Sequence, residues 1–118
     1  MRFLLLIQMA ADFQPPAIDD DELHSSMGAL LEEMAQAGIL LDTAGLRPVE
    51  EAVRVHLSRG SQTVVNGPFT ESKEIVGGYC LLQARSREEA VHWASRFLAL
   101  HLGDWEMTME IRQVDEPA

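Results

Sequence analysis

The sequence predicts a single α+β domain, and three observations lead to this prediction. The chain has 118 residues, enough for one hydrophobic core, and its 47% hydrophobic and 24% charged residues are typical of a globular protein. Short runs of apolar residues alternate with period two, as in strands, and longer runs recur at helical spacing. The runs come in the order of a β-α-β unit, a hairpin and a second β-α-β unit. This order is typical of a ferredoxin-like sandwich, β-α-β-β-β-α-β.

The first β-α-β unit begins with a strand over Met1–Met9 that is apolar on both faces. The start of this run imitates a signal peptide, but it is too short and Gln8 interrupts it, which favours a buried strand. A helix follows over Asp20–Ala37, because acidic residues at its start suit the helix dipole and Gly38 can end it. Ile39–Leu41 then begins a short strand or an extended connection.

The hairpin and the second β-α-β unit follow from shorter signals. Alternation over Val53–Ser58 predicts a half-buried strand, and a Ser-Arg-Gly-Ser turn leads to its neighbour, Gln62–Val65. Ile75–Ala84 is another strand that is apolar on both faces. Ser86–Glu89 has the spacing of a capping box and starts the second helix. Trp105–Arg112 alternates cleanly between apolar and polar residues and is predicted as the last strand.

The two strongly apolar strands predict a homodimer. Right-handed crossovers place both helices on the same face of the sheet. Met1–Met9 and Val76–Ala84 are nevertheless apolar on both faces, so the face without helices needs a cover. A second subunit laid sheet to sheet would provide it.

The stretch NGPFTESKEIVGGYCLLQARSREEAVHWA resembles the signature of the YCII-related family. Members of that family usually carry Asp-Gly-Pro-Phe, then Glu-Thr-Lys-Glu and a strand with a glycine before an aromatic residue. The similarity continues through MGALLEEMAQAGILLDTAGLRP before it and MEIRQV after it, so it covers nearly the whole chain. The resemblance implies a dimeric α+β barrel related to muconolactone isomerases. Asn66 stands where the family usually has Asp, and the Cys-Pro loop often found after the second helix is absent.

The tetrapeptide that ends in Phe69 is followed by a charged tail that a plain turn does not need. This tail is either a solvated loop or the rim of a ligand site, and in the second case Lys73 with Arg112 would hold an anionic group of the ligand. Arg112 has an alternative role in a cross-strand ion pair with Glu110 at the sheet edge. Tyr79 could donate a hydrogen bond into the same cavity, although core packing is its ordinary role. The predicted substrate-binding residues are Asn66, Phe69, Glu71, Lys73, Glu74, Tyr79 and Arg112.

Three residues are candidates for acid–base catalysis: His24, His56 and Glu110. His24 lies one turn before Met27, the position where certain family members place a helix histidine. Each histidine has an alternative role as a surface or boundary residue without a function. No histidine has zinc-like spacing to another ligand, so we predict neither a metal nor a cofactor.

Charge and cysteine content restrict the class of partner. With 9 basic and 19 acidic side chains the formal net charge is -10, which argues against nucleic acid and membrane partners. The one cysteine, Cys80, lies in an apolar run, where a buried and inert thiol is expected, and it fits a reducing cytoplasm. Two functions are therefore predicted. One is a cofactor-independent isomerase or lyase acting on a small anionic substrate, and the alternative is a non-catalytic ligand-binding or interaction module.

Overall fold

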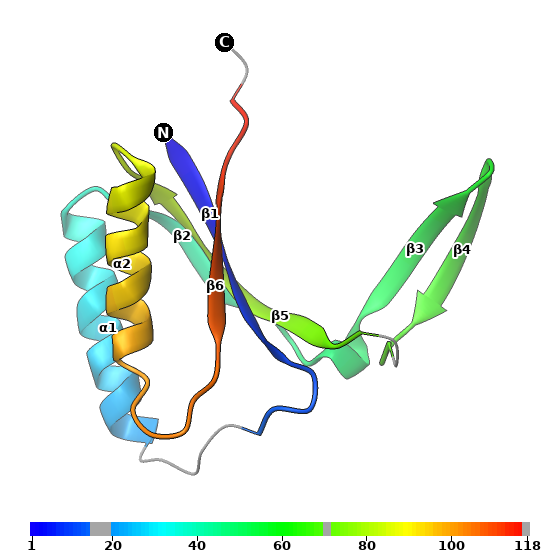
Figure 1. Ribbon diagram of the computed structural model, residues 1–118, viewed down its shortest axis with the longest axis horizontal. Coiled ribbons are helices and arrows are strands. Elements are labelled where there is room, and N and C mark those ends of the chain that lie inside the picture. Colours follow the sequence, from blue (N-terminus) through cyan, green and yellow to red (C-terminus); the bar gives the residue numbers. More distant parts are fainter. Residues whose placement is uncertain (15–19, 70–71, 117–118) are drawn as a thin grey trace.

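Six strands and two α-helices make up the described part of the chain, which in this computed structural model comprises residues 1–14, 20–69 and 72–116. The order agrees with the predicted α+β ferredoxin-like class (Figure 1). The segment after the first helix, predicted as a short strand or an extended connection, is a full strand. A single 3-10 turn, η1, follows that strand. The elements are β1 (Arg2–Ala10), α1 (Asp20–Gln36), β2 (Leu40–Gly45), η1 (Val49–Glu51), β3 (Val53–Ser58), β4 (Ser61–Asn66), β5 (Glu74–Gln83), α2 (Arg87–Ala99) and β6 (Thr108–Gln113).

The two strands that are apolar throughout lie in the interior of the main sheet. Its order is β2-β5-β1-β6 and all its pairs are antiparallel, so β1 and β5 are the interior strands. Leu5 of β1 is opposite Cys80 of β5 on one side and Ile111 of β6 on the other. Interior strands have neighbours at both edges, and their apolar side chains on one face enter the core.

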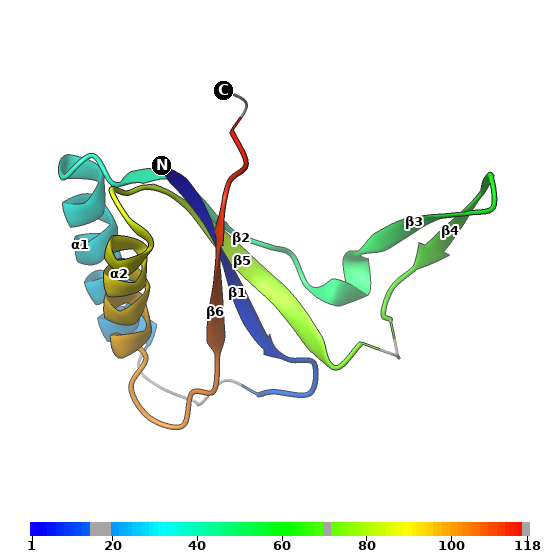
Figure 2. The same cartoon turned by 45° about the horizontal axis from the view of Figure 1, so that its top comes forward.

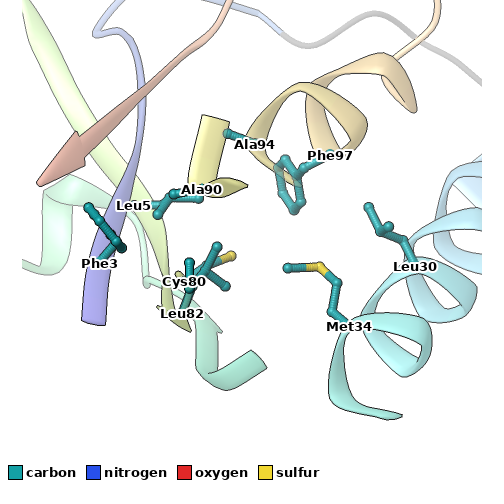
Figure 3. Close-up of a cluster of buried hydrophobic side chains, with 10 residues drawn as sticks. Phe3, Leu5, Leu30, Met34, Cys80, Leu82, Ala90, Ala94 and Phe97 are labelled. Carbon is teal, nitrogen blue, oxygen red and sulfur yellow. The ribbon is translucent and has the colours of Figure 1, made fainter. Parts of the chain in front are cut away.

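Both helices cover the same face of this sheet, as predicted (Figures 1 and 2). The core lies between the helices and the sheet, and its largest fully buried side chains come from β1 and β5 (Figure 3). Burial of each large apolar side chain stabilises the fold by about 1.5–3 kcal/mol. The buried cluster comprises Phe3, Leu5, Leu30, Met34, Cys80, Leu82, Ala84, Ala90, Ala94 and Phe97.

Cys80 is buried within this core, as the sequence predicts, with 2% of its surface exposed. Burial raises the pKa of its thiol, and a contact of 3.3 Å between its Sγ and the Thr43 Oγ1 acts in the opposite direction. The Thr43 hydroxyl also donates to the Tyr79 carbonyl oxygen, at 2.9 Å. A thiol held in this state is a packing group rather than a nucleophile.

The opposite face of the sheet, here called the open face, carries apolar residues that neither helix covers. Leu4 is opposite Leu81 on one side and Arg112 on the other, and Leu6 is opposite Tyr79 and Glu110. The four apolar or aromatic side chains of this set are half-buried, whereas both charged ones are exposed. The double-sided apolar character of β1 and β5 is therefore real, and its second face has no cover within the described chain.

The β3–β4 hairpin stands away from the main sheet, and here the prediction of a half-buried strand is wrong. The alternation itself is correct, because Val55 is opposite Val64 and His56 is opposite Thr63. All residues of both strands are exposed, because they pair with each other and with no other strand of the described chain. The radius of gyration is 16.4 Å, against about 13.5 Å for a compact domain of this length.

Three boundaries differ from the predictions or refine them. β6 begins at Thr108 rather than at Trp105, because Trp105 contacts other aromatic rings instead of a neighbouring strand. The first helix ends close to Gly38, which has the positive φ of 74° expected of a helix stop. The Ser86 Oγ accepts from the Glu89 N–H at 3.1 Å, as the capping box requires, while the Glu89 carboxylate accepts from Arg85.

Among the described residues, neither helix combines the length and apolar character that crossing a membrane requires.

Candidate functional site

The Asn-Gly-Pro-Phe tetrapeptide packs tightly against the 3-10 turn η1. The Gly67 N–H donates to the Ala52 carbonyl oxygen at 2.7 Å, and the Gly67–Pro68 peptide bond is cis. A Cβ added to Gly67 would lie 2.5 Å from the Val49 carbonyl oxygen and 3.0 Å from that of Ala52. The backbone φ of Gly67 is not positive, so glycine is required here for close approach rather than for a left-handed conformation.

Phe69 and Arg54 form a stacked pair next to this turn. Phe69 is 9% exposed but lies outside the main core cluster, so its ring does not pack onto that core as an aromatic anchor. Instead the Arg54 guanidinium carbon lies 3.7 Å from the ring centroid, a cation–π geometry. The Arg54 Nη2 also donates to the Ser72 Oγ at 3.0 Å. Stacking and hydrogen bonding together orient a guanidinium beside the motif.

A groove of about 590 Å³ lies beside this pair, between η1, the tetrapeptide and the starting end of β5. Most of its lining is apolar and comes from Met9, Val49, Phe69, Ile75 and Val76, among others. Among the described residues its polar groups belong to Arg47, Arg54, Ser72 and Glu74. The Arg47 Nη2 lies 3.0 Å from the Glu51 Oε2 at the exposed rim. An apolar groove with a few convergent polar groups is the usual form of a small-molecule site.

The structure brings only part of the predicted motif residues to the groove. Phe69 and Glu74 line it. Asn66 is exposed at the end of β4, opposite Val53, and does not line it. Lys73 lies beside the groove, in a separate shallow depression. The Lys73 carbonyl oxygen accepts from the Ala11 N–H at 2.9 Å. Glu71 lies outside the described residues.

Tyr79, Glu110 and Arg112 lie on the open face of the main sheet rather than at the groove. The Tyr79 hydroxyl donates to the Asp42 Oδ2 at 2.8 Å. The Arg112 Nη1 is 4.0 Å from the Glu110 Oε2, along one edge strand, so the ion-pair alternative holds in part, though the pair is not between strands. Both groups are exposed, and such surface pairs contribute little to stability.

Lys73 and Arg112 do not line one cavity within a single chain, so the prediction of a shared cavity is wrong for the single chain. Lys73 lies at the level of Ala11, beyond the end of β1, whereas Arg112 is opposite Leu4. Seven residues of strand separate these levels, or about 23 Å. The cause is register: the motif loop enters β5 at the end of β1 that is remote from Arg112.

The three acid–base candidates lie on three different parts of the fold. His24 is exposed on α1, in the helical layer. His56 is exposed on β3 of the hairpin, and Glu110 is on the open face. The sheet separates His24 from Glu110, so the structure does not assemble the three into one catalytic group.

Sequence reasoning missed Arg47, Arg54 and Ser72 as groove residues. Arg54 shares one face of β3 with His56, which the alternation shows, but its stack on Phe69 depends on how the tetrapeptide folds back. The available signal was the tetrapeptide itself, because a buried aromatic residue beside a strand with an arginine favours such stacking.

A second, smaller cavity of about 180 Å³ lies between the start of α1 and the segment after α2. Trp105 lines it, and its buried Nε1 has no hydrogen-bond acceptor among the described residues. Of the described residues that line it, Glu22 is the charged one, and none of these is a predicted site residue. Within residues 1–14, 20–69 and 72–116, no three histidine, cysteine or carboxylate side chains are grouped as metal ligands would be.

Tyr79 provides a pH-dependent test of the open face. Its hydrogen bond to Asp42 raises the pKa of the phenol above its ordinary value of 10.0. The stability that the bond contributes is present below pH 10 and is lost as the pH rises through the higher folded pKa. Tyr79 is the single tyrosine of the chain, so tyrosinate absorbance reports on it alone. We expect the pKa of Tyr79 to be higher in the folded than in the unfolded protein, and Asp42→Ala should bring the two pKa values closer together.

Comparison with known proteins supports the resemblance seen in the sequence. The family model described as the YCII-related domain matches residues 1–109. A protein of Rhizobium meliloti (strain 1021), "Uncharacterized protein R00369", is 32% identical over 76 residues. That match spans 64% of this chain and 61% of the other protein. The chain belongs to the YCII-related domain family.

Proposed function

We propose that this protein is a homodimeric domain that binds a small anionic molecule in the groove beside the tetrapeptide. The observation that carries the proposal is the Arg54 guanidinium, stacked on Phe69 and bonded to Ser72 where it lines the groove. The lone buried cysteine favours a reducing compartment such as the cytoplasm.

Because the chain has an acidic net charge, the presence of Arg54 in the groove is informative. A formal net charge of -10 repels anions from most of the surface, yet two of the polar groups of the groove are the guanidinium groups of Arg47 and Arg54. A guanidinium is a planar group whose donors match the paired oxygens of carboxylates and phosphates, and stacking on Phe69 fixes the plane of this one. The apolar lining around it would bury the remainder of the ligand.

The reaction proposed from the sequence, an isomerisation or elimination without a cofactor, needs an acid–base group in this groove. Glu74 supplies its carboxylate. A carboxylate can remove a proton next to an anionic group that Arg54 holds. The alternative is a non-catalytic binding module, and it is favoured by the absence of His24, His56 and Glu110 from the groove lining.

Arg54→Met tests the proposal directly. A charge-assisted hydrogen bond contributes about 1.5–3 kcal/mol, so its loss should weaken binding about 10- to 150-fold. A panel of small carboxylates and phosphate monoesters is first screened for a rise in melting temperature. The rise given by the best compound should then disappear in Arg54→Met.

Arg85→Met is the matched control, because it removes the same charge from an exposed arginine that does not line the groove. The ligand response of this variant should equal that of the wild type. Equal losses in both variants would mean that the anion responds only to the net charge, which would contradict a site at Arg54. Turnover of the bound compound that depends on Glu74 would favour the enzyme over the binding module.

A further inference from the structure

The hairpin Val53–Asn66, here called the arm, exposes an unusual amount of apolar surface. Val55 and Leu57 are each 65% exposed and Val64 is 63% exposed. Register places Val53, Val55, Leu57 and Val64 on one face of the arm, and Arg54, His56 and Thr63 on the other. Contiguous exposed apolar side chains of this kind mark an interaction surface.

The arm also lacks the packing that keeps a hairpin folded. Its strands pair with each other and with no other strand of the described chain. A two-stranded hairpin alone is at best marginally stable in water, and a hairpin normally needs a further strand or a packed face. The arm is anchored at its base, where Gly67 bonds to Ala52, but its apolar side chains stay exposed among the described residues.

Charge indicates what covers this face. The arm contains Arg54 and Arg59 and no Asp or Glu, so its formal charge is +2. The remainder of the chain therefore carries -10 minus 2, which is -12. A basic, apolar arm complements a strongly acidic body, and the acidic body available at equal concentration is another copy of the same chain.

The arrangement of the fold favours the same occupant. Figures 1 and 2 show the arm and the main sheet diverging, near the start of β5, like the two sides of a V, with both helices on the outer side of the sheet. The inner side of the sheet is the open face, with Leu4, Leu6 and Leu81. A body that enters the V meets the open face and the arm together, and two-fold symmetry repeats both contacts.

We infer that the arm of each subunit clasps a second copy of this chain, with the apolar face of the arm continuing the interface formed by the open face. The inference rests on the homodimer of the proposed function and adds the arm to it. Each arm is then ordered by the other subunit, and Arg54 at its base is held by an element that the other subunit fixes.

Cross-linking tests the arm directly. Leu57→Cys places a thiol on the apolar face, while Cys80 is buried and reacts slowly, with the wild type measuring its background. A photoreactive maleimide is attached to the new thiol, and the labelled protein is mixed with isotopically heavy, unlabelled protein. Light and heavy peptides joined by mass spectrometry are expected after irradiation. Cross-links only within the light chain, or none, would overturn the inference.

Light scattering over a range of protein concentrations tests the role of the arm separately from dimerisation itself. The double variant Val55→Asp, Leu57→Asp should raise the dimer Kd about a hundredfold or more. Thr63→Asp, on the opposite face of the arm, should leave the Kd within a few fold of the wild type. A double variant with the same dimer Kd as the wild type would overturn the proposed role of the arm, but it would not contradict the proposed homodimer. A monomeric wild type would overturn both.

Discussion

Replacing Gly67 by alanine is expected to lower the free energy of unfolding by about 2–4 kcal/mol, from overpacking and a lost hydrogen bond. The new Cβ would lie 2.5 Å from the Val49 carbonyl oxygen, a distance that backbone atoms cannot tolerate. The tetrapeptide or η1 must then move, which also lengthens the bond between the Gly67 N–H and Ala52. Chemical denaturation of the purified variant measures the change.

Gly28→Ala is the control for this experiment. Gly28 lies within α1, and an added Cβ there meets nothing within 4 Å. Alanine in a helix interior is more favourable than glycine by about 0.5–1 kcal/mol, so this variant should be slightly more stable than the wild type. A Gly67→Ala protein as stable as Gly28→Ala would mean that the tetrapeptide does not pack against η1 as described. Because the same contact shapes the groove, Gly67→Ala should weaken ligand binding as well.

Replacing Leu82 by alanine is expected to cost about 2–5 kcal/mol, the range for a fully buried leucine. Leu82 is 0% exposed and packs between the sheet and both helices. The cavity left behind lies inside one subunit, so the loss should be the same at every protein concentration. Thermal unfolding at several concentrations measures it.

Leu81→Ala makes the comparison informative. Leu81 is the neighbour of Leu82 but points to the open face, where it is half-buried in a single chain. Its replacement should lower stability mainly through the dimer, so the loss should depend on protein concentration. A loss that is independent of concentration and as large as that of Leu82→Ala would contradict an interface on the open face.

The fold was predictable because its signals are local. Period-two and helical spacing identified the strands and helices, and the two strands that are apolar on both faces are the interior strands of the main sheet. The prediction failed for the hairpin, where burial depends on what packs against the strand. Alternation in β3 shows that Val55 and Leu57 share a face, but it does not show what lies against that face. Alternation alone therefore predicts a half-buried strand, although β3 is exposed.

The candidate site was less predictable, because it depends on register and on how one loop folds back. Lys73 and Arg112 belong to strands of one sheet, and only the pairing of β1 with β5 and β6 shows that they lie at remote levels. Arg54 is the opposite case, because it lies close to the tetrapeptide without any sequence pattern that predicts it. It lies 15 residues before Phe69, and no periodicity connects the two residues. Their stacking follows from the tight packing of Gly67 on η1.

The position of Arg54 couples two equilibria, subunit association and ligand binding, that are usually measured separately. The residue lines the groove, yet it belongs to the arm, whose order we attribute to a second copy. Association of subunits then preorganises the guanidinium, and a bound anion in turn favours association by the same factor. Dilution alone would release the ligand, with no competitor present. In a cell, occupancy of the groove would follow the amount of this protein as well as the amount of its ligand.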